Sequence, residues 1–348
     1  MKTKPLNVGV IGCGAHGRGH VAGYGQLLDA CIVAVADADL QRAKQVAVEF
    51  GVEYHYVDYR EMLARHPLDI VSLALPPALN PDAALAAFAV GAHVMASKPL
   101  AVSLAQAEKI ITTARSTGKL LTMGLQNRCL PEVQALRRII ANGRLGRVYH
   151  ARLWHGHVMH VPPTPTMYQR ALAGGGVLFH TMIHLLDAVL WALGNPRPVR
   201  ATASSYRKFG RMSNPPATWE GPVDACDIED FNVGLVHFAD GSTMSLESNW
   251  LMHPRTRQSG AELLGDWGVA GLRPLSLELE QEGEIIDATP ELPANPPDAF
   301  GQICLDFCQS IRQNRTPLVR FGEMLNVQRI MDTLYRAADS GHEVKILT

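Results

Sequence analysis

Several features that would tie this chain to a particular environment or partner are missing. Its six cysteines include no Cys-x-x-Cys pair and no disulfide framework, so we interpret them as reduced thiols. A formal net charge of −1 favours neither nucleic acid nor an acidic membrane surface as partner. No apolar run is long enough to cross a membrane, and no targeting segment precedes the first strand-like run. We therefore expect a cytoplasmic, soluble protein with a small, uncharged or mildly polar ligand.

Internal repeats and low-complexity tails are also missing, which leaves an ordinary globular composition. Hydrophobic residues make up 47% of the chain and charged residues 19%. Because 348 residues exceed what one hydrophobic core usually supports, we expect two domains.

What is present begins with a glycine-rich turn near the N-terminus. An apolar run over residues 6–11 leads into Gly12, Gly14 and Gly17, and a helical pattern follows through residues 27 and 28. In a dinucleotide-binding turn, the first glycine permits the sharp bend, the second leaves room for a pyrophosphate, and the third lets the helix approach the strand. The helix N-terminus then directs N–H groups and partial positive charge at the phosphates. A glycine-rich turn in another kind of α/β protein is the alternative.

An acidic residue after the next apolar run favours the dinucleotide interpretation. Residues 31–36 form that run, and Asp37 follows it, close to where the acid that binds an adenosine ribose should fall. A carboxylate there would repel a 2′-phosphate, so we expect NAD in preference to NADP. Arg42 is near in sequence but lies a turn into the following helix.

Strands and helices alternate as far as about residue 125. We expect strands over 69–75, 92–95 and 120–123, and helices over 40–50, 83–90 and 103–116, with Ser103 as N-cap and Gly51, Gly91 and Gly118 at helix ends. This order predicts a doubly wound parallel sheet, whose ligand lies beyond the carboxyl ends of the strands.

The pattern changes after residue 126. We expect helices over 131–142 and 177–193, then strands over 147–157, 199–206, 229–238 and 242–250, the last two joined by a hairpin at 239–241. Residues 209–224, rich in Pro, Gly and Ser, form a long excursion that we interpret as a possible lid. Two amphipathic helices, 299–313 and 322–340, end the chain. This half predicts an α+β domain with a mostly antiparallel open sheet and helices on one face.

Two histidines and a lysine stand out as candidate catalytic residues. His180 and His184 are four residues apart, so on an α-helix they share one face of an otherwise apolar element. Two satisfied core histidines are the alternative. Lys98 follows the 92–95 strand at the edge where the ligand should lie, and lysine is rarely placed there for stability alone.

These motifs together resemble the Gfo/Idh/MocA family of NAD(P)-dependent oxidoreductases, which includes inositol dehydrogenases and glucose–fructose oxidoreductase. The likeness extends over nearly the whole chain: the glycine turn, Asp37, the Leu75-Pro76-Pro77 strand end, Ser97-Lys98-Pro99, residues 174–187 and the later strands. It implies that Lys98 contacts substrate and nicotinamide, and that His184 exchanges the proton of the substrate hydroxyl.

Three positions depart from the family pattern. Ser97 replaces a glutamate, His180 replaces the aspartate four residues before the catalytic histidine, and Asn80 stands where the family often has a histidine. Without two acids near Lys98, protonation of His180 is disfavoured. A neutral His180 can still accept a hydrogen bond from Lys98 or donate one to a substrate oxygen.

A further group of histidines follows the 147–157 strand. His155 and His157 alternate onto one strand face, and His160 comes shortly after. By the resemblance this strand end lines the substrate pocket, so the imidazoles would bind sugar hydroxyls. A Zn, Ni or Cu site shared with His180 and His184 is one alternative, and exposed loop histidines are another. We expect no metal.

The sequence patterns and the family resemblance together predict two domains and the residues of each site. Residues 1–125 form an NAD-binding Rossmann domain, with cofactor contacts from Gly12, Gly14, Ala15, His16, Gly17, Asp37, Leu75, Pro76, Lys98 and Gln126. Residues 126–348 form a substrate-binding and oligomerisation domain, with substrate contacts from Lys98, Arg128, His155, His157, Tyr168, His180 and His184, of which Lys98, His180 and His184 are catalytic.

Three functional hypotheses are compatible with these residues. The leading one is an NAD-dependent dehydrogenase that moves a hydride from a hydroxyl-bearing carbon of a sugar, cyclitol or related polyol. The second is a glycoside-cleaving enzyme that works by transient oxidation and elimination. The third is a non-catalytic, nucleotide-dependent sugar sensor. We expect a homodimer or homotetramer, with neither nucleic acid nor a membrane as partner.

Overall fold

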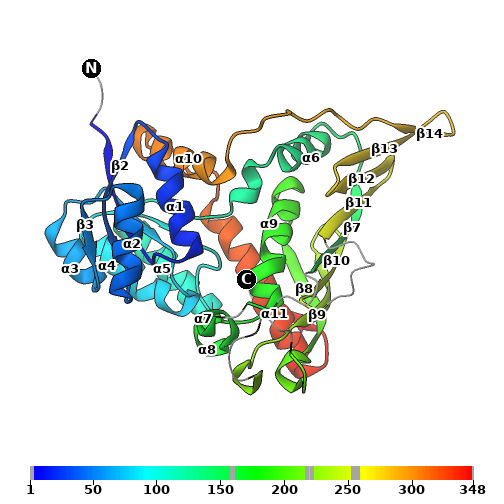
Figure 1. Ribbon diagram of the computed structural model, residues 1–348. Helices are drawn as coiled ribbons and strands as arrows, with labels where there is room; N and C mark the ends of the chain where they lie inside the picture. The colour runs from blue at the N-terminus through cyan, green and yellow to red at the C-terminus, as the bar shows by residue number, and fades with distance from the viewer. Residues whose placement is uncertain are drawn as a thin grey trace. The chain divides into compact units, whose positions relative to one another are not determined.

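The computed structural model describes residues 4–156, 161–162, 164–215, 219, 223–251 and 259–346 (Figure 1). The chain forms two compact units. One comprises Met1–Gln126 and Pro297–Leu325, and the other comprises Asn127–Pro296 and Asn326–Thr348. The sequence predicts domains over 1–125 and 126–348. In the structure, residues 297–325 belong to the first unit instead.

The first unit contains a six-stranded parallel sheet in the order β3-β2-β1-β4-β5-β6. This is the doubly wound arrangement that the sequence predicts. Its strands are β1 (Leu6–Ile11), β2 (Ala30–Ala36), β3 (Tyr54–Tyr56), β4 (Ile70–Leu73), β5 (His93–Ala96) and β6 (Leu121–Met123). The pattern missed β3, because three partly exposed residues at the sheet edge carry no apolar run.

The helices of this unit are α1 (Ala15–Gly25), α2 (Leu40–Phe50), α3 (Tyr59–Arg65), α4 (Asn80–Ala89), α5 (Leu104–Ser116) and α10 (Ala299–Gln313). As expected, the Ser103 hydroxyl accepts a hydrogen bond from the N–H of Gln106, and Gly51 ends α2 in the left-handed conformation. The first helix ends at Gly25 rather than continuing through Leu28, whose side chain is 96% exposed and gains nothing from helical packing. The expected strand over 69–75 stops at Leu73.

The second unit contains a nine-stranded sheet in the order β14-β13-β12-β11-β7-β10-β9-β8-β15. Its strands are β7 (Val148–Gly156), β8 (Pro198–Tyr206), β9 (Phe231–Phe238), β10 (Thr243–Asn249), β11 (Ser259–Gly265), β12 (Gly268–Leu272), β13 (Ser276–Gln281), β14 (Glu284–Asp287) and β15 (Val344–Lys345). Among the described strands of this second sheet only β7 and β10 pair in parallel, so the mostly antiparallel sheet is confirmed. The strands from β11 to β14 were not expected.

Helices cover one face of this second sheet (Figure 1). They are α6 (Pro131–Ala141), α9 (Ile183–Ala192) and most of α11 (Phe321–Ser340), while α7 (Pro165–Tyr168) and α8 (Arg170–Ala173) are single turns. The expected helix over 177–193 does not begin as an α-helix. It opens with a π-helical turn, Leu178–Met182, in which the N–H of Ile183 bonds to the carbonyl of Leu178.

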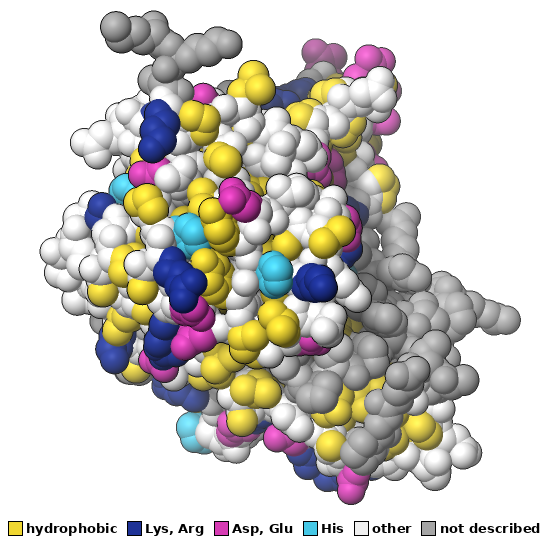
Figure 2. Space-filling model, turned by 60° about the vertical axis from the view of Figure 1, so that its left-hand side comes forward, with side chains coloured by type: hydrophobic (Ala, Val, Ile, Leu, Met, Phe, Trp, Pro, Cys, Tyr) yellow, Lys and Arg dark blue, Asp and Glu magenta, His cyan; other side chains and the backbone are white. Residues whose placement is uncertain are grey.

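The helical stretch Arg170–Ala192 corrects the expectation that no segment is long and apolar enough to span a bilayer. It has 23 residues and meets that requirement by length and composition, but 78% of the apolar window is buried inside the protein. Such burial is typical of a core helix. On the face shown in Figure 2, basic and acidic side chains are interspersed, in keeping with the near-zero net charge.

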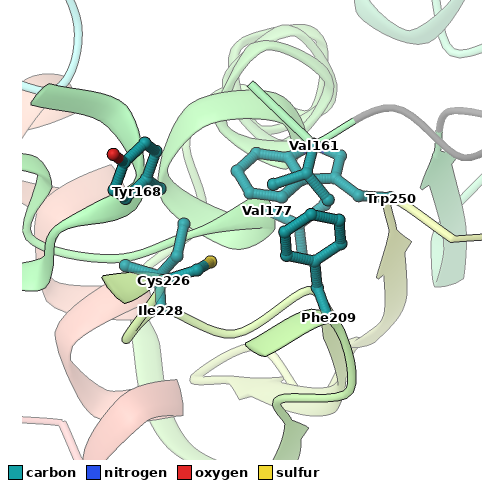
Figure 3. Close-up of a cluster of buried hydrophobic side chains, with 7 residues drawn as sticks. All are labelled: Val161, Tyr168, Val177, Phe209, Cys226, Ile228 and Trp250. Carbon is teal, nitrogen blue, oxygen red and sulfur yellow. The ribbon is translucent and has the colours of Figure 1, made fainter. Parts of the chain in front are cut away.

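An apolar cluster packs beside the π-helical turn (Figure 3). It consists of Val161, Tyr168, Val177, Phe209, Cys226, Ile228 and Trp250. The excursion interpreted as a lid begins inside this cluster, because Phe209 is fully buried and its N–H bonds to the carboxylate of Asp230. Residues 216–218 and 220–222 of that excursion lie outside the described part of the chain.

Candidate active site

The three glycines of the N-terminal turn are required for three different reasons. Gly12 has a φ of +94°, and a Cβ there would lie 2.3 Å from the carbonyl oxygen of Ala74. A Cβ on Gly17 would lie 1.9 Å from the carbonyl oxygen of Gly12. A Cβ on Gly14 would meet no atom within 4 Å. Gly14 therefore borders open space, as a residue that admits a pyrophosphate must.

The beginning of α1 is equally suited to a dinucleotide. Gly14 is its N-cap, and no side chain caps this end of the helix. Its first N–H groups and the positive end of the helix dipole are therefore directed at the space beside Gly14. The residues present fit the expected cofactor.

Asp37 connects this turn to the predicted ribose site. One carboxylate oxygen accepts a hydrogen bond from the N–H of Cys13 at 2.8 Å, and the other accepts one from the N–H of Asp39 at 2.9 Å. The Arg42 guanidinium, expected to lie too far along the helix, reaches Asp37 at 3.5 Å and Asp39 at 3.4 Å. The ribose end of the site thus holds both a carboxylate and a partly exposed cation.

Lys98 lies just beyond β5 with its side chain only 8% exposed. This burial lowers the pKa of its ammonium group to about 8. The segment after it is held by Asn80, whose amide donates to the carbonyl oxygens of Pro99 at 3.2 Å and Leu100 at 3.1 Å. Asn80 is itself fully buried, so in this chain it positions the lysine segment.

Two histidines on α1 form a polar feature that the sequence interpretation did not develop. The Nδ1 atom of His20 lies 2.8 Å from the hydroxyl of Ser72, and burial lowers the pKa of this imidazole to about 3. One turn earlier, His16 reaches the surface, yet the surrounding protein and then the charge of Lys98 lower its pKa to about 4. Both rings lie against Phe300 of α10. We therefore expect both imidazoles to be neutral at pH 7.

In the second unit, solvent access identifies the candidate catalytic histidines. Every residue from 177 to 192 is buried except His180 and His184, which are half-buried. The π-helical turn adds a residue to the turn that contains His180, so the α-helical spacing behind the shared-face prediction does not hold there. Partial exposure, rather than that spacing, is what the two imidazoles share.

The turn that carries His180 is held at its start by Glu229. The buried carboxylate accepts hydrogen bonds from the N–H groups of Gly176 at 2.8 Å and Leu178 at 3.1 Å, and from the Tyr335 hydroxyl at 2.8 Å. A Cβ on Gly175 would lie 2.0 Å from that hydroxyl oxygen, and one on Gly176 would lie 1.9 Å from the Glu229 carbonyl oxygen. The glycine run thus leaves room for the Tyr335 hydroxyl and for the backbone of Glu229. Sequence reasoning missed Glu229, because its partners are far away along the chain.

Arg128 and Tyr168, which we expected to contact substrate, occupy interior positions. Arg128 forms a two-pronged ion pair with Asp187 at 2.9 and 2.6 Å, and both side chains are 1% exposed. Tyr168 packs against Trp219 within the apolar cluster, with ring centroids 5.0 Å apart. The geometry of Arg128 is that of a residue that anchors α9, and it leaves no exposed guanidinium for a substrate.

The remaining predicted residues are placed only in part. His155 is half-buried near the end of β7, whereas His157 and His160 lie outside the described residues. Leu75, Pro76 and Gln126 are partly exposed just after β4 and β6. Within the described ranges, no three His, Cys, Asp or Glu side chains are grouped closely enough to hold a metal ion.

The first unit therefore has the fold and glycine turn of a dinucleotide-binding domain. Residues 6–125 match the model of the oxidoreductase family with an NAD-binding Rossmann fold, and residues 133–270 match the GFO/IDH/MocA C-terminal domain. The chain belongs to the GFO/IDH/MocA family of oxidoreductases, and NAD is its cofactor.

Several similar proteins are named as dehydrogenases of sugars or glycosides. D-glucoside 3-dehydrogenase of Escherichia coli is 27% identical over 99% of both chains. Levoglucosan dehydrogenase of Pseudarthrobacter phenanthrenivorans is 25% identical over 76% of this chain and 72% of its own. A solved structure of levoglucosan dehydrogenase with NADH superimposes with a TM-score of 0.87 at 21% identity, covering 99% of this chain and all of the other, which supports the fold.

Proposed function

We propose that this protein is an NAD-dependent dehydrogenase that oxidises a hydroxyl-bearing carbon of a sugar or glycoside. The observation that carries the proposal is that imidazoles occupy the only two partly accessible positions on the core helix, residues 177–192. Membership of the family supports NAD as the hydride acceptor. Full-length similarity to a glucoside dehydrogenase supports a sugar or glycoside as the substrate.

In this proposal each residue has one role. NAD⁺, held by the glycine turn, would supply the hydride acceptor for the carbon that bears the reacting hydroxyl. Lys98 holds the oxygen of the reacting hydroxyl, and His184 takes its proton as general base, so alcohol becomes carbonyl. His180 orients the sugar through a neutral ring nitrogen. The cofactor is contacted by the residues predicted from the sequence, namely Gly12, Gly14, Ala15, His16, Gly17, Asp37, Leu75, Pro76, Lys98 and Gln126.

We also propose that the two sequence halves keep their expected roles, with cofactor binding in residues 1–125 and substrate binding in 126–348. The sheet face opposite the helices carries Tyr206 and Val233, both exposed among the described residues. A homo-oligomer would bury these side chains between copies. The thiols of Cys13, Cys31, Cys226 and Cys308 are free, as a reducing cytoplasm would keep them.

The test is to incubate purified protein and NAD⁺ with a panel of glycosides, sugars and polyols while NADH absorbance is followed. We expect NADH formed in proportion to the oxidised sugar. Release of an aglycone without net NADH would instead support the elimination route. Sugar binding without either product would support a sensor and overturn the proposal.

A further inference from the structure

The imidazole of His180 has a specific aromatic neighbour. Its ring lies 6.3 Å from the ring of Trp250 at an interplanar angle of 21°, an offset stacked arrangement. Trp250 comes immediately after β10, whereas His180 lies in the π-helical turn. The contact therefore connects the sheet to the turn.

Trp250 is firmly anchored on both its polar and apolar sides. Its indole N–H donates to the Thr181 hydroxyl at 2.8 Å, and its side chain is 1% exposed. It belongs to the apolar cluster, beside Val177 and Phe209 (Figure 3). Because Thr181 follows His180 directly, one indole both ties the turn in place and stacks on the ring that the turn presents.

The stacked geometry restricts His180 in a defined way. A ring that rests on a fixed indole cannot rotate out of that plane without losing the stacking contact, so its nitrogen edges point in a limited set of directions. Glu229 holds the N–H groups at the start of the same turn, so the turn is held at two points.

We propose that Trp250 is a positioning residue for His180, which it keeps in the orientation that binds the sugar hydroxyl. This inference rests on the proposed dehydrogenase function. The stacking contact orients the His180 ring. The aspartate that the family has at this position could not be held in the same way, because it has no ring to stack.

The first experiment is a double-mutant comparison of sugar oxidation. Trp250→Leu removes the aromatic ring, Trp250→Phe keeps a smaller ring without the indole N–H, and Thr181→Val removes the hydrogen bond while the indole stays intact. The two milder variants keep the proposal testable if the leucine variant does not fold. Trp267→Phe, at a 59% exposed tryptophan, is the control. We expect kcat to fall about tenfold in Trp250→Leu and less in the milder variants, with KM for NAD⁺ unchanged.

The same Trp250→Leu substitution is then made in the His180→Ala variant, and its effect on kcat is compared with its effect in the wild type. There, Trp250→Leu should change kcat by less than about twofold, because the residue it positions is gone. Equal losses in both backgrounds would show a merely structural role and overturn the proposal, as would full activity in Trp250→Leu.

A second readout does not depend on activity. The His180 imidazole signal in a histidine-selective NMR spectrum, identified by its loss in His180→Ala, should shift when the indole ring is removed and stay unchanged in Trp267→Phe. If no sugar is oxidised but this signal shifts, only the proposed function fails. If sugars are oxidised but the signal does not shift, the positioning proposal fails.

Discussion

The Tyr335 hydroxyl donates a 2.8 Å hydrogen bond to Glu229, which in turn receives the N–H groups of Gly176 and Leu178. This contact joins α11 to the start of the turn that carries His180. Burial raises the pKa of Glu229 above its ordinary value, although all three donors oppose that rise. The candidate catalytic histidine is thus supported by a carboxylate that sequence patterns do not reveal.

Removing this support should destabilise the protein. Glu229→Gln turns one acceptor into a donor facing a backbone N–H, so we expect a loss of about 2–3 kcal/mol in the free energy of unfolding. Tyr335→Phe should cost about 1–2 kcal/mol. Tyr149→Phe, at an exposed tyrosine, is the control and should change stability by less than about 0.5 kcal/mol. Urea unfolding measures all three, and equal stability of Glu229→Gln and wild type would contradict the role given to the carboxylate.

Lys98 should produce a pH dependence in the alkaline range. Since its pKa is lowered to about 8, its positive charge is lost above that pH, and kcat/KM for the sugar should fall there. An arginine stays charged, so any activity left in Lys98→Arg should lack this descending limb. An unfolded lysine keeps its proton to about pH 10.4, so this residue's contribution to stability rises between about pH 8 and 10.4. A profile that stays flat to pH 9.5 would argue against the assignment.

His20 should make the fold sensitive to acid. Burial lowers the pKa of His20 in the folded protein to about 3, whereas in the unfolded chain it is about 6.5. Between these two pH values the unfolded chain binds more protons, so the free energy of unfolding decreases as the pH falls from about 6.5 to 3. The slope from one such group is at most about 1.4 kcal/mol per pH unit. His20→Asn retains a group able to bond Ser72 but cannot be protonated, so it should lose less stability than wild type between pH 7 and 5. Parallel losses in urea unfolding would sink this prediction.

Cofactor preference should depend on Asp37 and Arg42 in opposite ways. The carboxylate favours a ribose hydroxyl and repels a 2′-phosphate, so NAD⁺ should bind more tightly than NADP⁺ in fluorescence titrations. Arg42→Gln removes the cation 3.5 Å from Asp37 and should weaken NADP⁺ further while sparing NAD⁺. Equal or tighter binding of NADP⁺ by wild type would refute the preference.

Turnover should require Lys98 and His184 but no metal. Lys98→Met and His184→Ala should each lower kcat by about 10²- to 10⁴-fold with NAD⁺ binding largely intact. Treatment with a chelator should leave wild-type activity unchanged. Elemental analysis that found about one Zn or Ni per chain, lost together with activity, would reverse this expectation and favour the histidine metal site.

The elements that could be predicted correctly from the sequence are those stabilised by local interactions. The strand β1, the caps of α2 and α5 and the β9–β10 hairpin each depend on residues within a few positions of one another. The glycine turn belongs to the same group, because a positive φ and a missing Cβ are properties of single residues. Short-range periodicity and capping therefore sufficed for the doubly wound sheet and its cofactor turn.

The contacts that support the candidate catalytic residues join parts of the chain that are far apart in sequence, so they could not be predicted from it. Glu229 acts on residues 51 to 53 positions earlier, Tyr335 acts on Glu229 across 106, and Arg128 is neutralised by Asp187 across 59. The return of α10 to the first unit likewise depends on residues far apart in the chain, such as Phe300 against His16 and His20. No local pattern encodes these contacts, because each buried polar group is stabilised by a residue that folding alone brings within hydrogen-bond distance.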